Sequence, residues 1–159
     1  MEPKKYAWIL PGRLAVAIRP GGAGRNHRRE RRCAELDWWR SQGVVAIVSA
    51  LPTRHGLSAY ADRDFAVRWH PLHDPGQAAE EMPALVATVR GLLDVHPAGA
   101  VLVHCDMANE WLAAIDASLR IGIGLARRPR TALRAAAADG LPVGSLATSI
   151  LGCPTSAAA

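Results

Sequence analysis

A short apolar run that ends in His-Cys and precedes a helical pattern is the feature that most constrains this chain. Residues 100–103 are too few for a helix and rich in β-branched side chains, which indicates a strand buried on both faces. His104 and Cys105 follow at its carboxyl end. After a few residues, apolar side chains recur at helical spacing, at Leu112, Ile115 and Leu119. The segment 100–126 is therefore predicted to form a strand, a tight loop and a helix.

This arrangement favours a reactive cysteine. A strand, tight loop and helix together point backbone N–H groups and the positive end of the helix dipole at an anion. Such surroundings stabilise a thiolate, lowering the pKa of a thiol from about 8.5 into a range of about 3.5 to 7.5. Cys105 is therefore a candidate nucleophile.

The stretch resembles the phosphate-binding loop of the cysteine-dependent tyrosine phosphatases, most closely the compact dual-specificity group. The motif of that family is His-Cys, five residues, then Arg and Ser or Thr, with Gly three residues after Cys. His104 and Cys105 match, but Ala108 replaces the Gly, Trp111 the Arg and Leu112 the hydroxyl residue. The family Arg grips a phosphoryl group with a planar fork, whereas an indole has a single N–H donor and no charge. The resemblance therefore implies a degenerate member of the family.

The resemblance also implies roles for other residues. Asp74 follows a strand-like segment at the family's usual spacing from Cys105, so the general acid is expected there. The alternative is that Asp74 is a turn residue and the N-cap of the helix that begins at Gln77. His104 is expected to orient the loop by hydrogen bonds, and Glu110 to add negative charge beside it. The residues expected to bind a ligand are Asp106, Met107, Ala108, Asn109, Glu110 and Trp111.

Three functions follow from this loop. The first, which we predict, is a pseudophosphatase that binds a small-molecule or protein ligand at the Cys105 loop without ordinary phosphatase activity. The second is a phosphatase in which Cys105, His104 and Asp74 act and an arginine of segment 25–32 replaces the missing one. The third is a thiolate reaction on a substrate without phosphate, with Asp74 or Glu110 as acid or base. A neutral or cationic substrate would suit Trp111, because a cation can lie over an indole.

The rest of the chain predicts one α/β domain over residues 1–153, followed by a disordered tail of small residues at 154–159. We expect a three-layer domain like that of the dual-specificity phosphatases, with a central, mostly parallel sheet and helices on both faces. An edge hairpin or two short strands are predicted at 7–18, and this opening resembles the start of bacterial proteins of this kind. Strands are predicted at 44–48, 65–69 and 100–103, and helices at 30–42, 57–64, 77–95, from about 109, at 131–139 and within 141–151.

Composition fits a single domain of 159 residues with a net charge of +5. The 19 basic residues are all arginines except Lys4 and Lys5. The charged run at 25–32 is either an anion-binding arm or a solvated loop, and it lacks interleaved aromatic residues, so nucleic acid is not an expected partner. No uncharged apolar run approaches the roughly 20 residues that span a membrane, and no membrane association is expected. The oligomeric state is left open.

The cysteines and histidines bear on location and cofactors. Cys33, Cys105 and Cys153 are odd in number and widely spaced, which argues against a disulfide framework or a zinc site and for a reducing cytoplasm. His70 and His73 suggest a metal site with Asp74, but the sequence offers no matching pair of ligands. Neither a metal nor any other cofactor is therefore predicted.

Overall fold

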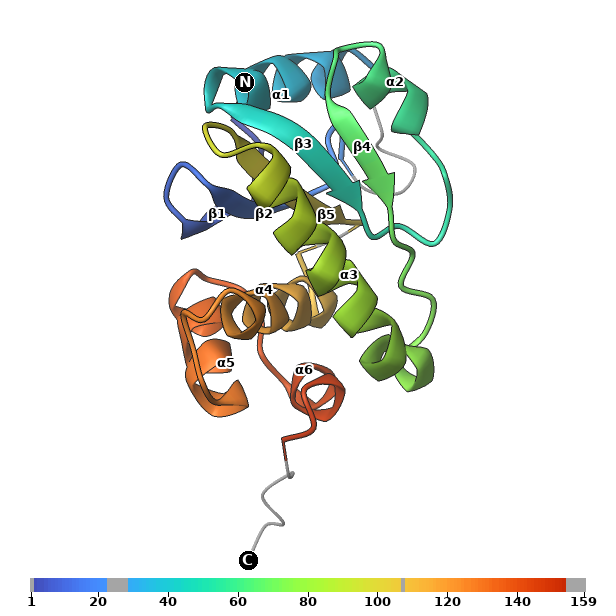
Figure 1. The fold of residues 1–159 in the computed structure, drawn as a ribbon. Helices are drawn as coiled ribbons and strands as arrows, with labels where there is room; N and C mark the ends of the chain where they lie inside the picture. Colours follow the sequence, from blue (N-terminus) through green and yellow to red (C-terminus); the bar gives the residue numbers. More distant parts are fainter. Residues whose placement is uncertain (1, 23–28, 107, 154–159) are drawn as a thin grey trace, which may run out of the picture.

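A computed structural model of the chain describes residues 2–22, 29–106 and 108–153 (Figure 1). Its centre is a five-stranded sheet in the order β1-β2-β5-β3-β4. β1 and β2 pair antiparallel as the predicted hairpin, and all other neighbours are parallel. The strand that ends in Cys105 is the middle one, as predicted. The strands are β1 (Tyr6–Leu10), β2 (Leu14–Ile18), β3 (Val44–Ser49), β4 (Ala66–Trp69) and β5 (Ala100–Cys105).

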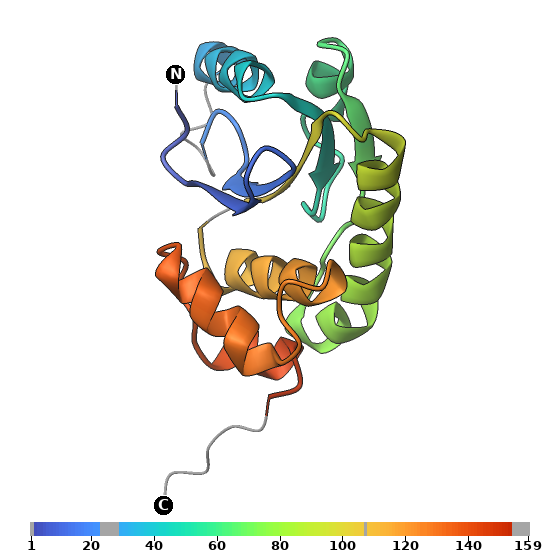
Figure 2. The same cartoon turned by 60° about the vertical axis from the view of Figure 1, so that its left-hand side comes forward.

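Helices cover both faces of this sheet, which confirms the predicted α/β class (Figures 1 and 2). α1 (Arg29–Ser41) and α2 (Leu57–Ala61) lie on one face. The other face carries α3 (Pro75–Val95), α4 (Glu110–Gly122), α5 (Pro129–Ala138) and α6 (Ser145–Ile150). The last helix is shorter than the helical segment expected within 141–151. The predicted tail at 154–159 lies outside the described residues, and no helix among those described is long and apolar enough to cross a bilayer.

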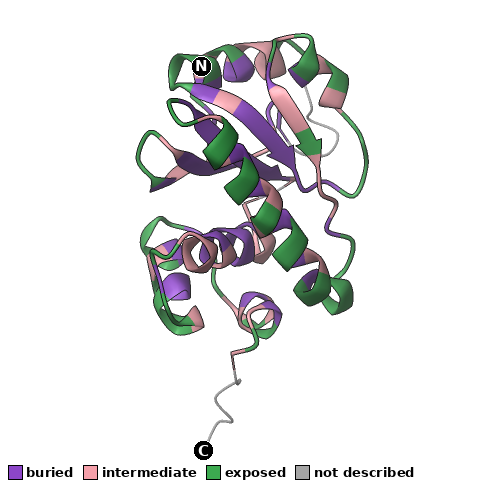
Figure 3. Ribbon diagram, in the orientation of Figure 1, coloured by how far each residue is buried: buried purple, intermediate pink, exposed green. Residues whose placement is uncertain are grey.

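Alternation along β5 divides the core in two. Val101, Val103 and Cys105 face the layer that contains α3 and α4, whereas Ala100 and Leu102 pack with α1 and α2. Because successive side chains of a strand point to opposite faces, neighbouring residues at the end of β5 meet different surroundings. Figure 3 shows β5 and the inner sides of the helices as buried. The predicted inward face of α3 is buried at Met82, Leu85, Val89 and Leu92.

The hairpin is also tied to the helical layer. Arg13, in the turn between β1 and β2, donates to the carbonyls of Leu93 at 2.7 Å and His96 at 2.6 Å, at the carboxyl end of α3. A guanidinium at this position neutralises the partial negative charge of the last helical carbonyls. The Arg13 contact holds the carboxyl end of α3. The amino end of α3 follows His73, which lines the same cavity as Cys105.

Candidate active-site cavity

Cys105 is the last residue of the central strand and lines a cavity of about 190 Å³. The residue is only 6 % exposed. The cavity lies at the carboxyl ends of the parallel strands, where ligand sites of α/β folds lie. Apolar and polar residues share its wall: Ala50, Pro52, Leu72, His73, Cys105, Asp106, Asn109 and Trp111. Four predicted site residues therefore meet here, namely Cys105, Asp106, Asn109 and Trp111.

His104 does not belong to this cavity. Its ring is fully buried on the opposite face, edge-on to Tyr60 at 5.5 Å and near Trp39 at 6.3 Å between ring centroids. Neither ring nitrogen has a hydrogen-bond partner of ordinary geometry within the described part of the chain. Burial lowers the pKa of His104 to about 3, and the adjacent backbone of Cys105 opposes this only in part. The ring is therefore neutral and packs in the core, while the backbone carbonyl accepts from Ala50 N at 2.9 Å.

Asp74 is the N-cap of α3. Its Oδ1 accepts from the backbone N–H of Gly76 at 2.9 Å and of Gln77 at 3.1 Å, and Pro75 occupies the first helical position. These are the roles that Asp and Pro commonly have at a helix start. Asp74 is not among the residues that line the Cys105 cavity. Of the two alternatives that the sequence left open, the structure shows the cap.

Glu110 is likewise directed away from the cavity. It is the first residue of α4, and its Oε1 accepts from the backbone N–H of Leu146 at 3.1 Å and of Ala147 at 3.3 Å, in the first turn of α6. The expectation that Glu110 lies beside the loop as an added negative charge is therefore wrong. Its carboxylate pairs with amides at a helix start, where negative charge is favourable.

A charged network fixes the loop that follows Cys105. Arg19 Nε lies 2.8 Å from Asp106 Oδ1, and the backbone N–H of Arg19 donates to the carbonyl of Cys105 at 2.8 Å. Glu35, fully buried on α1, accepts from Gly21 N at 2.7 Å and from Arg31 Nε at 2.7 Å. The sequence did not single out Arg19. Met107 lies outside the described residues, and so do positions 25–28 of the predicted anion-binding arm.

The start of α4 shapes the rest of the wall. Asn109 is its N-cap, accepting from Trp111 N at 3.1 Å through Oδ1, and both side chains line the cavity. Ala108 is partly buried and packs against the core. The indole of Trp111 thus lies where the resembled family has its arginine. No lysine or arginine of the described residues lines the cavity, which contains the carboxylate of Asp106 instead.

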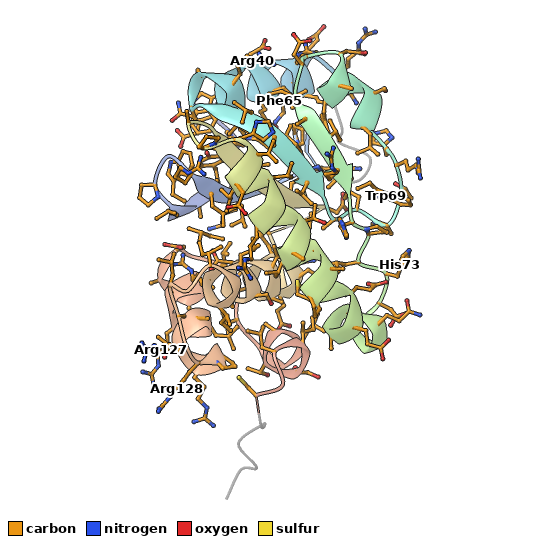
Figure 4. All side chains as sticks on the ribbon, viewed as in Figure 1. Arg40, Phe65, Trp69, His73, Arg127 and Arg128 are labelled. Atoms are coloured by element: carbon orange, nitrogen blue, oxygen red, sulfur yellow. The ribbon has the colours of Figure 1, made fainter. Side chains whose placement is uncertain are left out.

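Among the lining residues that were not predicted as part of this site, one is polar. His73 lies in the loop between β4 and α3 (Figure 4). It lines the cavity, and its Nδ1 lies 2.8 Å from Oε1 of Glu81 in α3. The sequence singled it out solely as a possible metal ligand. Among the described residues, no cluster of three or more His, Cys, Asp or Glu could hold a metal ion. The signal that could have found His73 was its position, next to Asp74 in the loop that faces Cys105.

No protein-family model and no curated protein matches this sequence. Several solved structures, however, are similar to this chain. Human DUSP28 superimposes with a TM-score of 0.69 at 15 % identity, covering 96 % of this chain and 95 % of its own. A mouse putative dual specificity phosphatase, crystallised with zinc tungstate, gives 0.69 at 14 % identity, covering 94 % of this chain and 86 % of its own. TpbA of P. aeruginosa gives 0.61 at 16 % identity, covering 91 % of this chain and 81 % of its own.

These similarities define a class of fold. The central, mostly parallel sheet and the helices on both faces match the fold of the dual-specificity and tyrosine phosphatases. The chain therefore adopts the dual-specificity-phosphatase fold, as its His104-Cys105 motif predicted.

Proposed function

We propose that this protein is a pseudophosphatase that binds a small-molecule or protein ligand at the Cys105 loop and does not catalyse ordinary phosphomonoester hydrolysis. The observation that carries the proposal is the position of Trp111, whose indole lines the cavity where a phosphatase needs a guanidinium. An arginine that stabilises a phosphoryl transition state is worth about 10³ to 10⁵ in rate in other enzymes. Without it, a phosphoryl dianion would find no cationic partner among the described residues that line this largely apolar cavity.

A phosphatase with a substitute arginine is less well supported. The guanidinium of Arg19 lies on Asp106, and that of Arg31 lies on Glu35 at 2.7 Å. Neither residue lines the cavity. A thiolate reaction on a ligand without phosphate remains the better alternative, since Cys105 itself lines the cavity beside polar side chains.

The proposal includes the reducing cytoplasm as the location. The three cysteines are odd in number and widely spaced along the chain, a pattern that argues against a disulfide framework. A ligand without a net negative charge is favoured by the apolar wall, because none of the described residues that line it is cationic.

Hydrolysis of an aryl phosphate by the wild-type protein and Cys105→Ser tests this function. We expect both to stay at background. Wild-type turnover that disappears in Cys105→Ser would refute the proposal.

A second variant tests the reason for this inactivity. Trp111→Arg combined with Ala108→Gly restores the Arg and the Gly of the family motif and leaves Leu112 in place. We expect this double variant to gain at least about tenfold in aryl phosphate hydrolysis, part of the effect attributed to such an arginine. The same double variant with Cys105→Ser is the matched control and should lose the gain. If the double variant stays inactive while folded and Cys105 remains reactive to alkylation, the missing arginine is not what prevents hydrolysis.

A further inference from the structure

The contact between His73 and Glu81 places a fixed imidazole on the wall of the Cys105 cavity. Glu81 binds His73 twice. Its Oε1 lies 2.8 Å from Nδ1 of the ring, and its Oε2 accepts from the backbone N–H of His73 at 3.2 Å. Because one carboxylate holds both the ring and the backbone, the ring has a defined orientation although His73 stands at the rim and its side chain is 49 % exposed.

This contact also selects the tautomer of His73. With the Nδ1 proton donated to Glu81, Nε2 is the basic nitrogen of a ring that lines the same cavity as Cys105. Thiol, imidazole and carboxylate in this order are the parts of a nucleophile activated by a general base that a third group orients. We propose that Cys105, His73 and Glu81 form a catalytic unit that hydrolyses a small carboxylic ester or thioester.

The proposal rests on the proposed function in that it takes the ligand of the cavity to be a molecule without phosphate, and it develops the thiolate reaction named there as the alternative. The chemistry balances without any cofactor. His73 Nε2 takes the proton of Cys105, the sulfur bonds to the acyl carbon, and the bond from that carbon to the leaving alcohol or thiol breaks. The imidazolium gives its proton to the leaving group. Water, deprotonated by His73, then attacks the acyl carbon of the thioester formed on Cys105. The carbon–sulfur bond breaks, the carboxylic acid leaves, and the Cys105 thiolate takes the proton back from His73.

The rest of the wall fits an acyl group. Ala50, Pro52, Leu72 and Trp111 make it largely apolar, and about 190 Å³ suits a short acyl chain rather than a drug-sized ligand. Asn109 also lines the cavity, and because its Oδ1 is bound to Trp111 N, its Nδ2 is oriented as a donor. A side-chain amide of this kind stabilises the oxyanion that forms when a nucleophile adds to a carbonyl.

The neighbouring histidine provides a matched control. His70, on the same loop, has its Nε2 2.7 Å from Thr88 Oγ1 and does not line the cavity. His70→Gln therefore removes an imidazole close in sequence without removing one from the cavity. Comparison with His73→Gln separates general effects of losing a histidine from the role proposed for His73.

The experiment uses p-nitrophenyl acetate and the full chain. We expect acetylation of Cys105, seen as a mass increase on its peptide, followed by turnover, and neither in Cys105→Ser. His73→Gln should lower the acetylation rate about 10²-fold or more, the contribution of a general base, and His70→Gln should leave it unchanged. Glu81→Gln should lower it less, because Glu81 only positions the ring. It should also change the pH–rate profile, which a purely structural role would leave in place.

A second measurement covers variants that fold poorly. In His73→Gly, added imidazole should restore acetylation, which a misfolded chain would not allow. Iodoacetamide should alkylate Cys105 of the wild type at lower pH than Cys105 of His73→Gln. Ester hydrolysis that survives Cys105→Ser, or equal acetylation rates and pH profiles for the wild type and His73→Gln, would overturn the proposal. Inertness towards both ester and phosphate refutes this inference alone, whereas wild-type aryl phosphate hydrolysis through Cys105 refutes the proposed function.

Discussion

The two faces of the sheet differ in how their polar side chains are used. On the face covered by α1 and α2, His104 and Glu35 are fully buried. The face covered by α3 to α6 also buries a carboxylate, that of Asp116. On this second face, however, Asp74 and Glu110 bind the amides of helix starts, and Cys105 opens onto a cavity. The first face is a closed core that contains polar groups. The second is a layer of capped helices around a site.

This difference between the two faces separates the two residues of the His104-Cys105 motif. His104 and Cys105 are adjacent, yet strand alternation sends the imidazole into the closed face and the thiol into the open one. We therefore expect His104 to affect stability, and Cys105 is the residue to which we assign a chemical role. The imidazole available to Cys105 is that of His73, from a different loop.

The largest expected effect concerns the closed face and is a loss of stability in acid that comes from His104. Its pKa of about 3 in the folded state lies below the ordinary value of 6.5. The folded chain thus binds this proton less readily than the unfolded chain. Above pH 6.5 this difference does not affect the free energy of unfolding. As pH falls from 6.5 towards 3, the free energy of unfolding decreases by about 1.4 kcal/mol per pH unit.

His104→Leu removes this titration and tests the prediction. Urea unfolding at several pH values between 6.5 and 4 should show a shallower fall in the free energy of unfolding for the variant than for the wild type. If the free energy of unfolding fell equally steeply with pH in both proteins, the imidazole of His104 would be protonated in the folded chain. This face of the sheet would then accommodate a charged side chain. His70→Leu, from a loop on the sheet edge, is the control for the loss of a histidine.

A smaller effect is expected on the open face, at Glu110. Glu110→Ala leaves the amides of Leu146 and Ala147 without their side-chain acceptor, so we expect a loss of about 1 to 3 kcal/mol in the free energy of unfolding. Glu110→Gln keeps an acceptor oxygen and should lose less. Glu80→Ala, an exposed residue of α3, should change little. If Glu110→Ala is as stable as Glu80→Ala, the carboxylate is not a structural element of this face.

The sequence predicted the fold because the pattern of its apolar residues is strong. The strand 100–103, the helix at 77–95 and the hairpin at 7–18 all follow from local periodicity and turns. The site was predicted less well. The partner of Glu110 is α6, which lies far from it in the sequence, and no local sequence pattern predicts that contact. His73 and Asp74 are adjacent polar residues, and local spacing cannot say which of them faces the cavity and which caps a helix.

The smallest expected effect distinguishes those two neighbours. Asp74→Ala removes the cap of α3 and should lower the free energy of unfolding by about 1 kcal/mol, whereas Asp74→Asn keeps a good N-cap and should stay within a few tenths. Thermal or urea unfolding of both variants checks this. The pair also separates structure from chemistry, since Asn preserves the cap but cannot donate a proton as an acid. If Asp74→Asn slowed ester hydrolysis while leaving stability intact, the acid of the site would be Asp74. The same residue would then both cap α3 and act in the cavity, and the distinction between capping and cavity-facing residues on this face would be wrong at Asp74.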